Sequence, residues 1–210
     1  MELTDNQIQR INSYLDAKGI KLIDFRIEIF DHIISEIERK LSNDNLDFET
    51  AFKLVIKKWN FELKKTNSFI FGRFYSAPKI VIDRAKRIFL KYFLASFSPI
   101  FISFLIIFNK KVLLSNVFGY FTFFSIVILL FISLFFVIKI IASKEKTVYS
   151  FIIKTQITNF IVMPYILVSN SINDIFNISI LIYMMVVNYY SILFYKKHKQ
   201  EKEKYKLLVG

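Results

Sequence analysis

Hydrophobic and polar positions alternate with helical spacing over the first third of the chain. Apolar residues at every third or fourth position place an apolar stripe along one side of each segment, which is typical of amphipathic helices. The pattern predicts three such helices, over about residues 5–18, 22–41 and 48–63. A core this small is marginal by itself, so we expect the module to lean on the rest of the chain, a second copy or a partner.

Local signals at the ends of these segments agree with the periodicity. Thr4 followed by Gln7 is a capping-box pattern, in which each residue satisfies a free backbone donor at the first turn. Gly19 supplies a left-handed residue after the first helix, and Asp47 is a good N-cap for the third. We therefore expect a three-helix domain over residues 1–66.

The rest of the chain is dominated by long apolar runs. A helix needs roughly 20 apolar residues to cross a hydrocarbon core of about 30 Å. Four runs meet that length, at about residues 88–108, 117–142, 151–168 and 175–195. The fold class expected is thus all-α, a cytoplasmic three-helix domain followed by a four-helix transmembrane domain. Residues 1–20 are polar and lack the apolar segment of a signal peptide.

Basic residues between the runs predict the orientation, because loops rich in Lys and Arg stay on the cytoplasmic side. A basic and aromatic linker at 67–87 precedes the first run, and a basic tail at 196–210 follows the last. Both termini are then cytoplasmic in a multi-pass membrane protein. The linker residues expected to contact anionic lipid are Arg73, Lys79, Arg84, Lys86 and Arg87.

Charge and composition fit this division. The 210 residues are 54% hydrophobic and carry a net charge of +12. Residues 1–88 hold 16 basic and 13 acidic side chains, while residues 89–210 hold 13 and 4. The excess charge therefore follows the expected membrane boundary, and we expect no nucleic-acid partner. The absence of cysteine excludes disulfides, thiolate metal sites and a cysteine nucleophile.

The second helix carries the one cluster of chemically interesting side chains. Its polar side holds five of them: Asp24, Glu28, Asp31, His32 and Glu36. Carboxylates and imidazole at this spacing could hold a divalent metal, tune a pH-responsive histidine or bind a partner, or they could simply be a solvated acidic face. A second ligand-bearing segment is missing, so we expect no metal and treat the face as a hypothetical partner-binding surface.

Polar residues within the apolar runs are few. Asn159 and Asn188 lie at similar predicted depths in the third and fourth runs, and we predict a hydrogen bond between them. Pro99 and Pro164 are expected to kink their helices. Neither Asp nor Glu interrupts the runs, which argues against an ion-coupled transporter.

The N-terminal segment resembles a known kind of module. The resemblance rests on Thr4–Ile11, Tyr14-Leu15, Gly19-Ile20, Asp24–Glu38 with its Asp31-His32 pair, and Asp47–Lys53. These strings look like the N-terminal module of a family of uncharacterised bacterial integral membrane proteins. More loosely they are similar to permease-prefix domains and to HAAS-type sensing domains tied to transcriptional regulation. The resemblance implies a membrane-tethered regulatory or interaction module and supplies no catalytic residues.

These features together predict an integral membrane protein with a regulatory, sensing or scaffolding role through its cytoplasmic helices. Its expected partners are membrane lipids and a protein partner or second copy bound by the N-terminal domain. No enzyme activity, catalytic residue or cofactor is expected. The alternative is a transporter or permease-associated component, with a polar path along the third and fourth runs through Gln156, Asn159 and Asn188.

Overall fold

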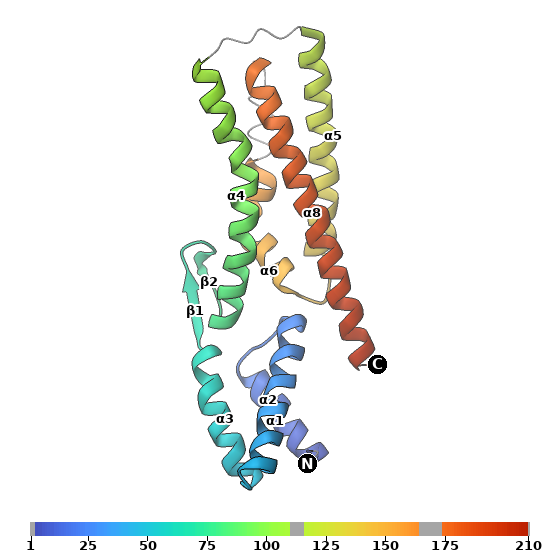
Figure 1. Ribbon diagram of the computed structural model, residues 1–210. Coiled ribbons are helices and arrows are strands. Elements are labelled where there is room, and N and C mark those ends of the chain that lie inside the picture. Colours follow the sequence, from blue (N-terminus) through green and yellow to red (C-terminus); the bar gives the residue numbers. More distant parts are fainter. Residues whose placement is uncertain (1–2, 110–115, 164–173, 210) are drawn as a thin grey trace. The chain divides into compact units, whose positions relative to one another are not determined.

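The computed structural model describes residues 3–109, 116–163 and 174–209 (Figure 1). Helices dominate the described residues, which contain a single two-stranded sheet, so the all-α class is confirmed. The chain divides into two compact units, and several helices contribute to both. Unit 1 comprises Met1–Ala85, Glu145–Val148 and Gln200–Gly210, and unit 2 comprises Lys86–Lys144 and Tyr149–Lys199.

Unit 1 begins with the three helices that the periodicity predicts. They are α1 (Asp5–Ala17), α2 (Ile23–Asn43) and α3 (Phe48–Glu62). The local signals are present too: the Thr4 N–H donates to Oε1 of Gln7 at 2.9 Å, and the Thr50 N–H donates to the Asp47 carboxylate at 3.2 Å. Gly19 has a φ of +69°, the left-handed conformation that ends α1.

The core of unit 1 forms where the apolar stripes of these helices meet. On α2 the buried residues fall at four-residue spacing from Phe25, through Ile29 and Ile33, to Ile37. Trp59 of α3, the single tryptophan of the chain, is buried in the same unit. This spacing puts Glu28 and Asp31 on the opposite side of the helix, away from the core.

The segment after α3 forms a β-hairpin where the sequence suggested a linker. Strand β1 (Lys65–Ser68) pairs antiparallel with β2 (Gly72–Pro78), and α4 begins directly after Pro78. An isolated hairpin is marginal in water. Here Phe71 is only 1% exposed, so the turn of the hairpin is pinned to the core of unit 1.

Unit 2 is built from the apolar runs. Its helices are α4 (Lys79–Asn109), α5 (Asn116–Ile141), α6 (Val148–Thr155), the short π-helix η1 (Thr158–Val162) and α8 (Asp174–Val209). Of these, α4 begins and α8 ends in unit 1. The expected tail at 196–210 is therefore no separate segment, because α8 continues through it to Val209.

Two helices are long and apolar enough to cross a membrane in the described part of the chain, against four expected. They are Tyr120–Ile141 of α5 and Ser179–Leu207 of α8. The third run is divided between α6 and η1, and its residues 164–168 lie outside the described residues. The side chains of residues 102–109, in the first run, are also outside them.

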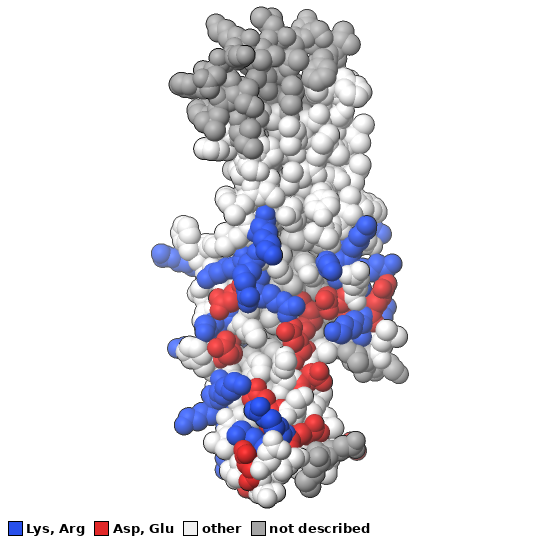
Figure 2. Space-filling view, viewed as in Figure 1, with Lys and Arg blue, Asp and Glu red and all other residues white. Residues whose placement is uncertain are grey.

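The surface of α5 shows how its apolar residues are used. Only 22% of its apolar window is buried, and Phe121, Phe124 and Phe131 are each more than 60% exposed. Figure 2 shows this uncharged surface on unit 2, in contrast to the mixed charges of unit 1. A core helix of a soluble protein buries such side chains, whereas a helix surrounded by lipid leaves them at the protein surface.

Candidate functional site

The N-terminus of α2 is bonded to the segment that connects α5 with α6. The Ile23 N–H donates to the carbonyl of Lys146 at 2.9 Å, and Leu22 forms a parallel bridge with Lys146. The Val148 N–H donates to Oδ2 of Asp24 at 3.0 Å. These residues all belong to unit 1. Backbone and side chain of one short stretch of α2 thus hold residues 146–148 in place.

The carboxylate of Asp24 acts as a cap for another helix. Val148 is the first residue of α6, so its N–H has no acceptor within that helix. An anionic side chain at this end is also favoured by the helix dipole. The second oxygen, Oδ1, is buried without a hydrogen-bond partner. Burial raises the pKa of Asp24 to about 6, and the negative charge of Glu201 acts in the same direction.

The C-terminal part of α8 also binds the connecting segment, at Glu145. Lys202 forms an ion pair with Glu145 at 2.8 Å. Hydrogen bonding to Lys202 lowers the pKa of Glu145 to about 2. Residues 145–148 are therefore bound by Lys202 at one end and by Asp24 at the other.

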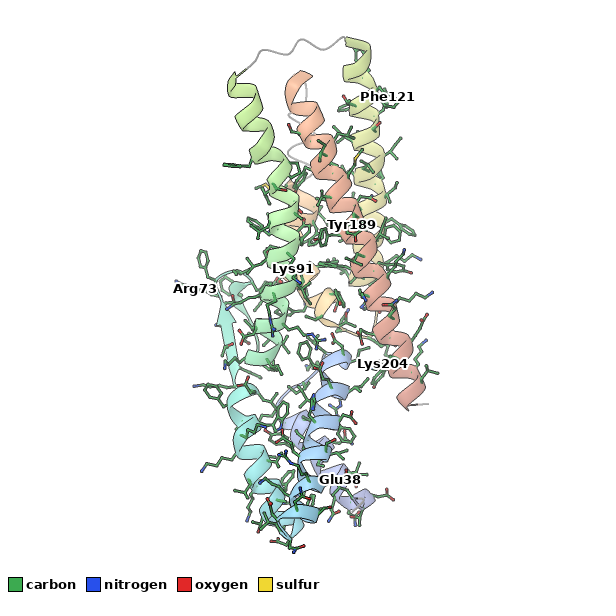
Figure 3. All side chains as sticks on the ribbon, in the orientation of Figure 1. Glu38, Arg73, Lys91, Phe121, Tyr189 and Lys204 are labelled. Atoms are coloured by element: carbon green, nitrogen blue, oxygen red, sulfur yellow. The ribbon has the colours of Figure 1, made fainter. Side chains whose placement is uncertain are left out.

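A pocket of about 190 Å³ lies beside Asp24 in unit 1. Its lining is almost entirely ionisable, drawn from α2, the first turns of α4 and the last turns of α8: Asp24, Ile27, Glu28, Asp31, His32, Arg84, Glu201 and Lys204. Figure 3 labels Lys204 on the last turns of α8. Charged rather than apolar groups line the pocket, so it suits a polar group of a partner molecule better than an apolar ligand.

The structure brings together four of the five α2 residues expected in a site. Asp24, Glu28, Asp31 and His32 line the pocket, whereas Glu36 is engaged by Lys58 at 2.7 Å. Glu28 pairs with Arg84, and the His32 ring stacks on Trp59 at 6.3 Å between centroids. Asp31 and His32 are exposed.

The basic residues expected to contact lipid separate into two groups. Lys79 lies 4.2 Å above the Phe61 ring and pairs with Glu62 at 3.5 Å, while Arg84 pairs with Glu28. These two are engaged inside unit 1. Arg73 on β2 and Arg87 on α4 are exposed, and Lys86 is partly exposed.

The predicted hydrogen bond between Asn159 and Asn188 is wrong. Asn159 donates to Oε1 of Gln156 at 2.7 Å, and Asn188 donates to the Leu129 carbonyl of α5 at 3.2 Å. Gln156 and Asn159 lie three residues apart, so they satisfy each other locally.

A different polar contact takes the place of that bond. The carbonyl of Asn159 accepts hydrogen bonds from the hydroxyls of Tyr92 and Tyr183, at 3.3 and 3.4 Å. In η1 the Met163 N–H donates to the Thr158 carbonyl, five residues back. Residue 164, a proline without an N–H, lies outside the described residues. The two tyrosine hydroxyls are the donors that the structure shows for the Asn159 carbonyl.

Pro99 of α4 is compensated in a similar way. Its missing N–H frees the carbonyl four residues earlier, at Ala95. The hydroxyl of Ser98 donates to that carbonyl at 3.2 Å, and α4 continues through the proline. The Ser98 hydroxyl thus satisfies a backbone carbonyl that Pro99 leaves without its usual donor.

Metal binding finds no support in the geometry. Across the parts of the chain that are described, no three His, Asp or Glu side chains lie close enough together to hold a metal ion. No family model, curated protein or solved structure matches the chain. The resemblance of the N-terminal segment to sensing modules therefore stays a prediction.

The sequence pattern assigns Arg84 to lipid contact rather than to this pocket, and it does not predict a place here for Glu201, Lys204 or the connecting residues 145–148. It treated the tail as uniformly basic, although Glu201 and Glu203 interrupt its lysines. That interruption was the available signal, because acidic residues add nothing to an anionic-membrane anchor. The partner of Asp24 had no local signal, since Val148 lies 124 residues away.

Proposed function

We propose that the chain is a membrane protein with a cytoplasmic helical module. This module has a sensing or regulatory role and responds to a rotation or shift of the membrane helices. In this proposal α4, α5, the segment of α6 and η1, and α8 are four spans of a bacterial inner membrane. Both termini are cytoplasmic. The exposed apolar surface of α5 and the hydroxyl bonds to the carbonyls of Asn159 and Ala95 support a lipid environment.

The contacts of α2 with residues 146–148 carry the regulatory part of the proposal. The connecting segment follows α5 and precedes α6 in the chain, yet it belongs to unit 1. Arg84 and Lys204 lie on helices that continue from the apolar runs. A rotation or shift of any of these helices would therefore change the groups around the pocket. The bistable element would be the attachment of α2 to the connecting segment.

The output would be a protein partner or a second copy bound at the exposed acidic residues of α2. Asp31 and His32 reach both the pocket and the outer surface. A change in the pocket would alter the charge that these residues present. Complementary charge mainly sets association rate and specificity, which suits a regulatory contact.

Site-specific crosslinking in native membranes tests this function. A photo-crosslinking amino acid replaces Asp31, in the otherwise native chain and in the Asp24→Ala variant. We expect a discrete adduct whose yield changes when Asp24 no longer holds Val148. The same crosslinker at Glu38, further along α2, is the control position. An adduct from Asp31 that is identical in both backgrounds would contradict coupling between the connecting segment and the output surface.

Cysteine labelling tests the proposed topology, because the chain contains no native cysteine. Single cysteines at Ser35 and Lys144 should react with a membrane-impermeant maleimide only after the membrane is opened. Cysteines at Lys110 and Ser171, in the loops expected to face outward, should react in intact cells. Reaction at position 171 only in opened cells would contradict four spans.

A further inference from the structure

The β-hairpin presents an unusual arrangement of aromatic side chains. Phe69 is 93% exposed and Phe74 is 100% exposed, whereas Phe71 between them is buried. Tyr75 is also exposed. Leaving a phenylalanine in water forgoes the favourable free energy of burying its ring. Two such side chains on one short hairpin therefore indicate a surface that is covered by something else.

The pairing of the two strands explains why these residues point outward. Asn67 pairs with Ser76, but the next residue, Ser68, pairs with Gly72. Residues 73–75 of β2 therefore have no partner on β1 and form a bulge. The Asn67 side chain holds the bulge by donating to the Arg73 carbonyl at 3.0 Å. Figure 3 shows Arg73 on the outer side of this hairpin. Bulges commonly redirect side chains in this way.

The charged residues of the hairpin segment itself are all basic. Lys64, Lys65 and Arg73 are exposed, and the sequence from residue 63 to residue 82 contains no Asp or Glu. Exposed aromatic rings beside cations match the interface of an anionic bilayer, where rings sit at headgroup level and cations contact phosphate. A second copy fits poorly, because pairing two identical hairpins would bring like charges together.

We propose that this hairpin is a binding site for anionic phospholipid at the bilayer surface. Phe69 and Phe74 enter the headgroup region, while Lys64, Lys65 and Arg73 contact lipid phosphates. The anchored Phe71 keeps the hairpin attached to unit 1, so lipid binding would restrain the module that carries α2. This site is separate from the charged pocket and does not depend on a partner for that pocket.

A fluorescent probe on the hairpin of the full chain tests the proposal. Ser76, exposed and next to the aromatic residues, is changed to Cys and labelled with an environment-sensitive dye. The protein is placed, one chain per disc, in nanodiscs of phosphatidylcholine alone or mixed with phosphatidylglycerol. We expect a shift of emission to shorter wavelength and stronger quenching by headgroup-region spin labels in the anionic discs. Salt should reduce both effects.

Matched variants assign the effect to the hairpin. Arg73→Glu and the double change Phe69→Ser with Phe74→Ser should each abolish the shift, while Trp59 emission stays unchanged and reports an intact unit 1. The same dye at Ser35 of α2 is the control and should not respond to phosphatidylglycerol. Equal spectra in both lipids, or no shift at all, would overturn the proposal. A shift that depends on protein concentration in micelles rather than on lipid would instead identify a second copy, and would overturn it as well.

Discussion

Asp24 accepts a hydrogen bond from the backbone of Val148, 124 residues later in the chain, over a distance of 3.0 Å. The bond joins the first turn of α2 to the first residue of α6. It uses a carboxylate whose second oxygen is buried without a partner. Burying a carboxylate costs free energy, so this bond attaches α2 to the start of α6 without making Asp24 a net source of stability.

Replacing Asp24 by Asn should stabilise unit 1 at neutral pH. Burial raises the pKa of Asp24 from 3.8 to about 6, so the folded state holds a proton that the unfolded state has already lost. The stability of the native protein should therefore fall as the pH rises from about 4 to about 6. Above that window the amide of the Asp24→Asn variant avoids the burial of a charge yet still accepts from Val148, with a gain of about 2–3 kcal/mol.

Urea unfolding of the full chain in micelles, followed by Trp59 fluorescence, measures this difference. The single tryptophan lies in α3 and reports on unit 1 alone. The free energies of unfolding of the native protein and Asp24→Asn should agree near pH 4. They should separate as the pH rises and differ by the full amount above about pH 6. Asp24→Ala is the control: it removes the charge but also the cap of α6, which costs about 1 kcal/mol. A constant difference between the native protein and Asp24→Asn across this range would contradict the prediction.

Removing the charge of Glu145 should release the end of α8. Lys202 pairs with Glu145 at 2.8 Å, and hydrogen–deuterium exchange of residues 200–206 should be faster in Glu145→Gln. Reversing both charges, Glu145→Lys with Lys202→Glu, should restore slow exchange. Since hydrogen bonding to Lys202 lowers the pKa of Glu145 to about 2, the protection should persist in mild acid and disappear as the pH falls towards 2.

The matched control for this ion pair is Glu38→Gln on α2, which should leave exchange in α8 unchanged. High salt should act in the same direction as Glu145→Gln, because the pair is partly exposed and screened. Unaltered exchange in Glu145→Gln would show that α8 is held by other contacts.

The two tyrosines on the Asn159 carbonyl should act as alternatives to each other. Tyr92→Phe or Tyr183→Phe keeps the ring and removes one donor, which should cost about 0.5–1.5 kcal/mol. The double variant should lose more than the sum, because the carbonyl then has neither donor. Thermal unfolding in micelles measures this, with the exposed Tyr189 changed to Phe as the control. Strictly additive losses would mean that the two hydroxyls act independently of each other, and would contradict this prediction.

The left-handed residue after α1 should tolerate few substitutions. Gly19 has a φ of +69°, and a Cβ there would meet nothing closer than Lys65 at 3.8 Å. Strain rather than a clash should therefore decide the outcome, with Gly19→Ala costing about 1–2 kcal/mol in the urea experiment. Gly19→Asn should cost less, because asparagine adopts this conformation more readily. Equal losses for the two variants would indicate a steric cause instead.

Periodicity and composition predict the helices of unit 1 and the separation of mixed-charge and apolar parts. Thr4, Gly19 and Asp47 act within a few residues of their partners, and the stripe through Phe25 and Ile29 needs only helical geometry. The acidic side of α2 follows from the same periodicity. Such features are local, so composition and spacing suffice to predict them.

The contacts of these side chains become known from the folded structure. It joins Asp24 to Val148, adds Arg84, Glu201 and Lys204 to the pocket, and gives Asn188 a carbonyl of α5 in place of Asn159. It also folds the expected linker into a hairpin with a bulge. Each of these depends on which segments, distant in the chain, come together. Burial of the whole apolar surface determines which distant segments come together, and no local spacing encodes it.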